Sequence, residues 1–355
     1  MKRMGGLWPT LTSADNLYLA ARRAARGKRA KPGVARFLYD LELEIPRLRR
    51  ELSDGSYQPG PYRSFLVRDP KPRLISAAPF RDRVVHHALT QVLEPIFERR
   101  FSARSYACRV GFGAHRALEE AARGFRSCAW VLKCDIRKYF ASINHALLLE
   151  QLGRVIKCRE TLALCARIIA HADPQEEELC YFPGDNLFTP AARRRGLPLG
   201  NQTSQFFANV YLDPLDQFVQ RELKPAGFVR YVDDFLVFAR SKPEGRSLLT
   251  AIERKLEKLR LRMHPGKSRV YRTADGVPFL GWRLFPTHRR LDRGNWIRFR
   301  RRARELQGAY AAGEMDWPEV QSRLMAWNAH ASHGDTWRLR ERLYDELVFR
   351  RGNAV

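Results

Sequence analysis

Three carboxylates that interrupt or end apolar segments constrain this chain more than any other feature of its sequence. Asp135 ends the apolar run 129–135, and Asp233 and Asp234 interrupt a second apolar run, 228–238. Such runs predict buried β-strands, the second as a hairpin whose turn carries the acidic pair. Carboxylates this close to a core are costly, because burial and neighbouring like charge both raise their pKa. A hard divalent cation removes that cost, so the pattern predicts a Mg²⁺ site.

This arrangement suits phosphoryl transfer. Two divalent cations about 3.5–4 Å apart can activate an attacking 3′-hydroxyl and stabilise a leaving pyrophosphate. A Tyr-x-Asp-Asp turn is weak evidence alone, because a solvated hairpin turn has a similar composition. The remaining sequence therefore has to support or reject a polymerase.

The charge balance indicates a polyanionic partner. Lys and Arg number 64 against 38 Asp and Glu, a formal net charge of +26, and the hydrophobic share of 45% excludes a disordered basic tail. Nucleic acid is the first candidate and an acidic membrane surface the second. The sequence has no apolar run near eighteen residues and begins without a signal-peptide pattern. We therefore expect a cytoplasmic protein with no membrane partner.

Local patterns predict an α/β chain without internal repeats or a long linker. Helices are expected over 13–29, 34–52, 82–100, 114–125, 144–172, 200–223 and 242–261, and from 295 onward. A strand hairpin with a basic tip is expected around 63–75, and another around 279–282. We treat 173–195 as a surface insertion. These elements favour one composite fold with lobes.

Five motifs, in the family's order, resemble those of reverse transcriptases. They are the first palm motif at 133–140, the nucleotide-pocket motif at 196–205, the catalytic box at 231–234, the lysine motif at Gly266-Lys267 and the primer-grip hairpin at 279–282. The resemblance implies an α/β (α+β) right-hand polymerase with fingers, a palm whose antiparallel sheet packs on helices, and a helical thumb. It implies a basic N-terminal helical extension at 1–60, fingers at 61–128, a palm at 129–285 and a basic thumb at 286–355.

The same resemblance assigns the catalytic centre. Asp135 and Asp233 would hold two Mg²⁺ ions, for which Mn²⁺ could substitute, with the Ile136 carbonyl as a further ligand. Asp234 would support the charge and geometry of the pair. The catalytic residues implied are thus Asp135, Asp233 and Asp234.

Four further residues match substrate-binding positions of the family. Phe140 matches an aromatic steric gate that leaves no room for a 2′-hydroxyl, so deoxynucleotides are expected. Lys71 and Arg73 match basic residues that grip the incoming triphosphate, and we favour Arg73 because a guanidinium fits phosphate oxygens. Lys267 resembles the lysine proposed to protonate pyrophosphate.

The pocket motif favours one subfamily. Retroviral and group II intron enzymes mostly carry Gln before the pocket glycine, whereas this chain has Leu199 before Gly200, followed by Ser204-Gln205. This pattern, and the thumb block at 327–336, resemble the reverse transcriptases of diversity-generating retroelements. Such enzymes copy a template-repeat RNA into cDNA that is erroneous mainly opposite adenines, and the cDNA diversifies a target gene. A small helical accessory variability protein is the partner that this subfamily implies.

Leu199 also suggests a physical cause of low fidelity. Leu offers only dispersion where Gln can form a hydrogen bond near the nascent pair, and losing that contact is worth on the order of 1–3 kcal/mol. Alternatively, Leu199 only packs under the start of the helix.

Other functions stay open at this stage. The nearest alternatives are a retron or intron-derived enzyme and a phage-defence polymerase that works without a template. A non-catalytic RNA-binding scaffold with the same fold is an alternative of a different class, although the three intact carboxylates argue against it.

Basic segments outside the catalytic motifs predict the nucleic-acid surface. Residues 283–304 are rich in Arg, interleaved with aromatic residues. We expect Arg298, Arg301 and Arg302 of this segment, together with Arg109, to contact template RNA and the RNA–DNA hybrid. The basic cluster 22–31 would bind template RNA or an accessory subunit.

Cysteine and histidine patterns argue against a zinc site. The six cysteines include no Cys-x-x-Cys pair, and the histidines are not spaced with them as ligands. We expect buried, unreactive thiols. His330 and His333 have no third ligand nearby in the sequence, so packing or capping within the thumb is the favoured role.

Overall fold

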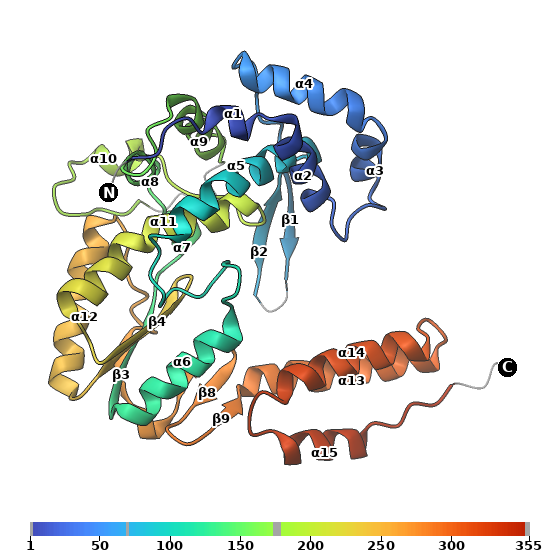
Figure 1. Cartoon of the computed structure of the whole chain (residues 1–355). Coiled ribbons are helices and arrows are strands. Elements are labelled where there is room, and N and C mark those ends of the chain that lie inside the picture. The colour runs from blue at the N-terminus through green and yellow to red at the C-terminus, as the bar shows by residue number, and fades with distance from the viewer. Residues whose placement is uncertain (1–2, 69–70, 173–178, 352–355) are drawn as a thin grey trace.

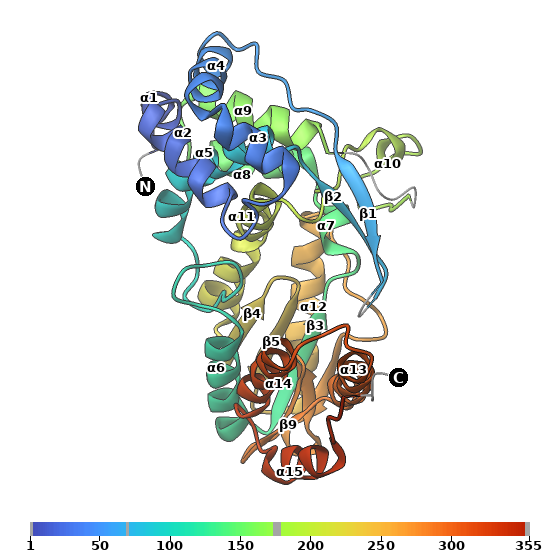
Figure 2. The ribbon, with the colours of Figure 1, turned by 90° about the vertical axis from the view of Figure 1, so that its right-hand side faces the viewer.

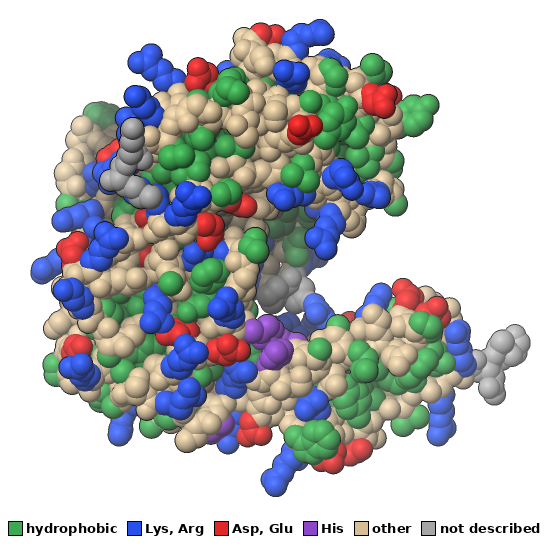
Figure 3. Space-filling model, viewed as in Figure 1, with side chains coloured by type: hydrophobic (Ala, Val, Ile, Leu, Met, Phe, Trp, Pro, Cys, Tyr) green, Lys and Arg blue, Asp and Glu red, His purple; other side chains and the backbone are tan. Residues whose placement is uncertain are grey.

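The computed structural model describes residues 3–68, 71–172 and 179–351 of the chain. It is a mixed α/β body with a helical arm at its C-terminal end (Figure 1). The arm consists of α13 (Arg293–Ala311), α14 (Trp317–Ala331) and α15 (Trp337–Glu346). A wide notch separates this arm from the upper part of the body (Figure 3).

The centre of the body is a four-stranded antiparallel sheet in the order β4-β5-β3-β6. Its strands are β3 (Trp130–Asp135), β4 (Gly227–Tyr231), β5 (Asp234–Ala239) and β6 (Arg269–Arg272). The predicted strand ending in Asp135 and the predicted hairpin around the acidic pair are both confirmed.

Alternate residues of these strands supply two different cores, as the period of a strand requires. Leu132 and Phe235 join the large core with α12 (Lys242–Lys258), whereas Val131 and Leu236 join a smaller core with α6 (Ala114–Ser127). The sheet is thus covered on both faces, which makes its strand ends rigid supports for the residues that follow them.

Helices of the upper body gather around α5 (Phe80–Glu98) and α11 (Gln202–Phe218) (Figure 2). The N-terminal helices packed there are α1 (Trp8–Leu11), α2 (Ala14–Ala24), α3 (Pro32–Tyr39) and α4 (Leu41–Ser53). The remaining helices are α7 (Tyr139–Ser142), α8 (His145–Gly153), α9 (Arg159–Ala170) and α10 (Thr189–Ala192), with a π turn at Val219–Leu223 and a 3-10 turn at Thr273–Asp275. Residues of α1 to α4 share the large core with the sheet, so the N-terminal segment packs as part of the body.

Two smaller antiparallel sheets complete the body. The hairpin of β1 (Arg63–Val67) and β2 (Arg73–Ala77) confirms the predicted basic hairpin and projects toward the notch (Figure 2). A three-stranded sheet contains β7 (Val277–Phe279), β8 (Trp282–Leu284) and β9 (Arg289–Leu291). Its first two strands confirm the predicted hairpin.

Several sequence predictions need correction. The helix expected over 34–52 is two helices that meet at Asp40, and Pro32 begins the first of them, because proline fits the first helical turn. The helix expected over 13–29 ends at Ala24, although Ser13 caps it by accepting a bond from the Asn16 N–H. Strand β9 was expected to be helical thumb or arginine-rich surface.

The described part of the insertion, 179–195, is mostly exposed, as expected, whereas the cysteines differ in part from expectation. Residues 173–178 lie outside the described residues, but the rest of the insertion is anchored by a buried Asp185 that pairs with Arg193. Of the cysteines, Cys108 is exposed and Cys180 is partly exposed, whereas the other four are buried. The expectation of buried thiols is therefore wrong for Cys108.

The arm has a small core of its own. Phe299 stacks on Trp327 with ring centroids 3.7 Å apart and planes 3° from parallel. Leu306 and Val320 belong to the same cluster, which is separate from both body cores. Among the described helices, none combines the length and apolar character that crossing a bilayer requires.

Candidate active site

The three predicted carboxylates converge at one end of the central sheet. Asp135 at the end of β3 lies directly opposite Asp234 at the start of β5 in the antiparallel register. Asp233 occupies the turn between β4 and β5, and its carbonyl accepts a bond of 3.3 Å from the Ile136 N–H. Residues about one hundred positions apart are thus fixed by backbone pairing.

The electrostatics of this cluster disfavour three bare negative charges. Burial raises the pKa of Asp233, and the charge of Asp135 raises it further. Burial raises the pKa of Asp234 to about 7, against the opposing effect of Lys133, whose Nζ lies 3.8 Å from Asp234 Oδ1. That oxygen is buried and accepts no hydrogen bond from the described residues. The site therefore has unmet capacity for positive charge.

The donor set fits Mg²⁺ better than a metal held entirely by protein. Within the described ranges, no three or more acidic, His or Cys side chains are arranged to hold a metal ion. Mg²⁺ is usually bound by one or two carboxylates, with substrate phosphates and water completing its shell. Two carboxylates from adjacent strand ends, together with a buried carboxylate oxygen that accepts no hydrogen bond from the described residues, match that requirement.

Asp135 is anchored through its backbone and contacted by a lysine through its side chain. Its N–H donates to Ser268 Oγ at 3.2 Å, and its carbonyl accepts from the His264 N–H at 2.7 Å. Lys267 Nζ lies 3.3 Å from both carboxylate oxygens of Asp135. The lysine singled out from the sequence therefore contacts the acidic cluster.

The pocket motif is joined to the loop that follows Asp135. The Leu197 N–H donates to the Phe140 carbonyl at 2.8 Å, and the Gly196 N–H donates to the Ile143 carbonyl at 2.9 Å. Phe140 is partly buried, with its ring 5.6 Å from that of Tyr139. The structure thus brings the predicted steric-gate residue and the pocket motif side by side.

The same motif is joined to the β1–β2 hairpin. The Ser76 N–H donates to the Leu199 carbonyl at 3.0 Å. Gly200 has a φ of +109°, and a Cβ there would lie 2.8 Å from Ile75 Cγ2, so only glycine fits without a shift. Gln205, one turn into α11, has an exposed side chain.

The two basic residues predicted to grip a triphosphate flank the hairpin tip. Arg73 begins β2 and is exposed, and its positive charge acts to lower the pKa of Asp233 against the dominant effect of burial. Lys71 is also exposed. Residues 69–70 of the tip lie outside the described residues.

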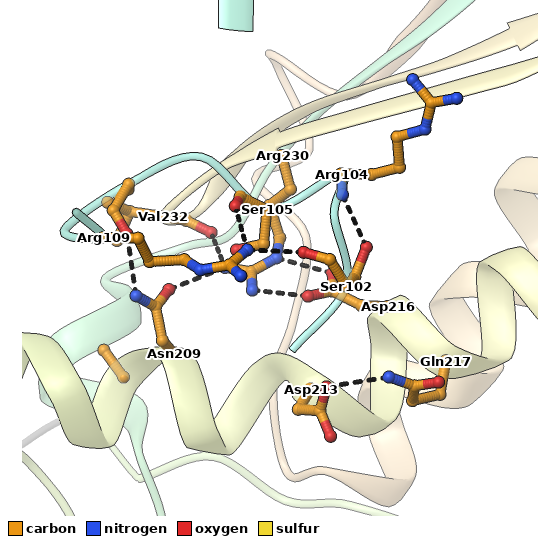
Figure 4. Close-up of polar contacts among 12 residues, drawn as sticks. Ser102, Arg104, Ser105, Arg109, Asn209, Asp213, Asp216, Gln217, Arg230 and Val232 are labelled. Carbon is orange, nitrogen blue, oxygen red and sulfur yellow. Dashed lines mark hydrogen bonds and ion pairs between the residues drawn. The ribbon is translucent and has the colours of Figure 1, made fainter. Parts of the chain in front are cut away.

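Sequence reasoning missed a buried charge network behind the turn that carries Asp233. Arg230, the last residue but one of β4, is 1% exposed and forms an ion pair with Asp216 of α11 (Figure 4). Arg230 lies in β4 and Asp216 lies in α11, and apolar residues supply most of the buried positions of both elements. A charged residue within a buried strand is itself a signal, because it requires a buried partner.

A family comparison identifies the fold around this site. The sequence model of the family described as reverse transcriptase (RNA-dependent DNA polymerase) matches residues 68–284, more than half of the 355-residue chain. The chain belongs to the reverse transcriptase family. Its fold class is therefore that of a right-hand polymerase, as the sequence predicted.

Relatives of this reverse transcriptase include proteins encoded in group II introns. It is 28% identical over 286 residues to Protein YkfC of Escherichia coli, covering 69% of this chain and 72% of that one. It is 27% identical over 183 residues to the group II intron-encoded protein LtrA of Lactococcus lactis, covering 50% of this chain but only 28% of LtrA. Among solved structures, an apo telomerase from Candida tropicalis, truncated from its C-terminal domain, has a TM-score of 0.48 at 12% identity over 68% of this chain and 59% of that one.

Arg109 of the reverse transcriptase does not present its charge to a ligand. Its side chain is 4% exposed and forms an ion pair of 2.8 Å with Glu98, while its Nη1 donates to the carbonyls of Ser102 and Ser105. It also lies 4.0 Å above the ring of Phe112. The predicted nucleic-acid contact is wrong for this residue, because its donors are used inside the fold.

The predicted arginines of the arm lie on α13. Arg301 and Arg302 are exposed, and Arg301 pairs loosely with Glu305 at 3.5 Å. Arg298 is partly exposed and bonds to Asn295. These three arginines thus lie on the surface of the arm.

Histidines cluster where the arm joins the body, and histidine side chains are visible at the inner corner of the notch (Figure 3). His333, just beyond α14, stacks on His115 of α6 at 3.8 Å, and His330 lies 5.4 Å from the ring of Trp282. The predicted packing role is confirmed, with the difference that the contacts join the arm to the body.

Proposed function

We propose that this reverse transcriptase performs Mg²⁺-dependent DNA synthesis on an RNA template at Asp135, Asp233 and Asp234. The observation that carries the proposal is their convergence, with one buried carboxylate oxygen that accepts no hydrogen bond from the described residues, inside a reverse transcriptase domain. Asp135 and Asp233, with the Ile136 carbonyl, would hold two ions, and Mn²⁺ could replace Mg²⁺. Bound there, the ions would lower the pKa of the primer 3′-hydroxyl and stabilise charge on the leaving pyrophosphate.

The chain's other residues bind and orient the substrate. Arg73, and with it Lys71, would contact the triphosphate from the β1–β2 hairpin, since Arg73 already acts on the Asp233 carboxylate. Phe140 would exclude the 2′-hydroxyl from beneath the sugar. Lys267 would exchange its contact with Asp135 for the pyrophosphate, to which it could donate a proton.

The proposed polymerase assignment also divides the chain into fingers, palm and thumb. The hairpin and α5 fall in the proposed fingers, 61–128, and the central sheet falls in the palm, 129–285. The arm is the proposed thumb, 286–355, whose exposed arginines would contact the phosphates of the RNA–DNA hybrid. The N-terminal extension, 1–60, packs on the fingers.

We further propose that the enzyme belongs with diversity-generating retroelements and copies adenines with errors. Leu199 supports this assignment, because its carbonyl is fixed by Ser76 while its side chain offers no hydrogen bond to a nascent pair. An accessory helical protein would complete the assembly. The relatedness to LtrA favours instead an intron-type enzyme that copies RNA faithfully.

Primer extension tests both proposals. The enzyme, with Mg²⁺ and dNTPs, should copy a primed RNA that contains all four bases, and sequencing of the cDNA should reveal errors concentrated opposite adenines. Uniformly faithful cDNA would favour the intron-type alternative. Failure to copy any RNA, with tight RNA binding retained, would favour a non-catalytic scaffold, and extension without template would indicate a phage-defence type.

A further inference from the structure

Arg230 carries a buried positive charge directly behind the catalytic turn. Its Nε donates to Asp216 Oδ1 and its Nη2 to Asp216 Oδ2, each at 2.6 Å, and both side chains are 1% exposed (Figure 4). This bidentate pair uses one edge of the guanidinium and leaves Nη1 free for other acceptors.

Nη1 reaches the turn itself. It donates to the Val232 carbonyl at 2.9 Å and to Asn209 Oδ1 at 3.4 Å. Val232 precedes Asp233 and has a φ of +58°. A β-branched residue rarely adopts this left-handed conformation, so the surrounding contacts must hold it there.

The network joins two parts of the proposed active site. Asn209 and Asp216 both lie on α11, the helix that starts at Gln202, within the nucleotide-pocket motif 196–205. Asn209 is fixed in turn, because its Nδ2 donates to the Ala107 carbonyl at 2.9 Å. One guanidinium therefore connects the pocket helix to the peptide that precedes Asp233.

We propose that Arg230 is a positioning residue, which holds the Val232-Asp233 turn at the distance from α11 that metal-dependent nucleotide addition requires. The inference rests on the proposed function and assigns this residue a role in it. Arg230 acts through the Val232 carbonyl and does not itself touch substrate. Displacement of a reacting group by about 1 Å can lower a rate by roughly a hundredfold, so the effect should appear in kcat.

Weakening a buried ion pair that has only a structural role should not lower kcat selectively. The chain offers such a pair as a matched control. Arg193 also has a buried side chain, also pairs with a carboxylate, that of Asp185, and also donates to a backbone carbonyl, that of Cys180, but none of these contacts involves Arg230 or the turn at Asp233. Arg230→Lys and Arg193→Lys each retain the positive charge and lose the planar guanidinium. A lysine nitrogen at 230 could not bond Asp216 twice and reach Val232 as well.

The test compares steady-state synthesis by Arg230→Lys, Arg193→Lys, Val232→Gly and Arg230→Lys/Val232→Gly. We expect Arg230→Lys to lower kcat at least about tenfold with the KM for dNTP within about threefold, and Arg193→Lys to leave kcat within about threefold. Adding Val232→Gly should restore several-fold of the lost kcat, because glycine adopts the positive φ without strain. Equal kcat losses in the two lysine variants, or no recovery with glycine, would overturn the inference.

Mn²⁺ binding without nucleic acid, followed by electron paramagnetic resonance, gives a readout that does not depend on activity. The Mn²⁺ dissociation constant should rise several-fold in Arg230→Lys and stay unchanged in Arg193→Lys, and equal values in both variants would contradict positioning. If Arg230→Lys does not fold, Asp216→Asn takes its place, because the amide keeps the shape of Asp216 and weakens the bidentate hold on the Arg230 guanidinium. The Mn²⁺ dissociation constant should then rise several-fold, and an unchanged value would overturn the inference. An inactive wild type would reject the proposed function, while these binding results would still test the positioning role.

Discussion

The catalytic turn and the C-terminal arm use charge in opposite ways. Around the turn, a few charged groups are buried or partly buried and each has defined contacts, such as Lys267 on Asp135 and Arg230 on Asp216. On the arm, many arginines lie exposed above a small separate core. The proposed chemistry at the turn would depend on geometry, whereas the proposed binding by the arm would depend on the number of charges. Single changes should therefore be severe at the turn and graded on the arm.

The largest effect is expected at the turn from Asp135→Asn. The substitution keeps the shape and removes a charge that the metal ions need, so kcat should fall by about a thousandfold or more. The affinity for primer–template should change less than about threefold. Rapid-quench kinetics and a binding titration measure both quantities. Asp275→Asn, which alters an exposed acid of the same lobe, is the control and should change neither; an equally damaged control would contradict the assignment.

A smaller effect is expected at Phe140, which tests selection of the sugar. Phe140→Ala opens the space beneath the sugar and should lower the preference for dNTP over rNTP by about a hundredfold. The ratio of kcat/KM for the two substrates measures this preference. Phe188→Ala removes an aromatic ring that is 76% exposed and should leave the ratio unchanged. Retained discrimination in Phe140→Ala would show that another group excludes the 2′-hydroxyl.

Leu199 tests fidelity within the same pocket. Leu199→Gln restores the hydrogen-bonding side chain and should lower errors opposite adenines by about tenfold, the size of one modest contact. Deep sequencing of cDNA measures the change. Leu197→Met, a volume-conserving change two residues away, provides the control. An unchanged adenine error rate in Leu199→Gln would leave Leu199 with a packing role only.

On the arm, the change should be graded. Arg298→Ala/Arg301→Ala/Arg302→Ala should weaken binding of an RNA–DNA hybrid several-fold and reduce the slope of log affinity against log salt by up to about 3, while kcat at saturating hybrid stays within about twofold. Titrations at several salt concentrations measure this slope. The control, Arg246→Ala/Arg254→Ala/Lys258→Ala, removes the same charge from α12. Equal losses of affinity in both triple variants would mean that only net charge matters.

The last prediction concerns the stability of the body, where we expect the smallest effect on activity. His86 is fully buried in α5, and burial, followed by the nearby His87 and Arg83, lowers its pKa to about 3. Unfolded histidine binds a proton near pH 6.5, so stability is complete above that pH and is lost as the pH falls toward 3.

From pH 7 to pH 5, the free energy of unfolding of the wild type should therefore fall by about 2 kcal/mol more than that of His86→Leu. Urea unfolding at the two pH values measures the difference. His288→Leu, in the loop between β8 and β9, is the control. Trp327 fluorescence reports on the core of the arm. If this core unfolds in acid before the body does, the expectation that the body is the more acid-sensitive region is contradicted.

The sequence predicted the strand ends and the acidic cluster well. Apolar runs bounded by turns defined β3, β4 and β5, and antiparallel pairing then brought Asp135 beside Asp234. Local composition determines these features, so no tertiary information was needed. The hairpin at Arg73 was predictable for the same reason.

Features that depend on distant partners were not predictable. Arg109 reads as a surface cation until Glu98 is placed against it, and Arg230 finds Asp216 only after α11 packs on the sheet. Strand β9 contains Arg289 and Arg290, whose charge resembles that of the following helix, and only pairing with β8 makes it a strand. Tertiary packing decides each of these cases.

Incorporation of a single nucleotide opposite each template ribonucleotide tests the central claim most directly. A primed RNA is mixed with one dNTP at a time and Mg²⁺, using the wild type and the Asp233→Ala/Asp234→Ala variant. We predict that the wild type adds the complementary nucleotide, with excess misincorporation opposite adenine, and that the variant adds none. Addition that ignores the template base, or synthesis that survives in the variant, would contradict the account.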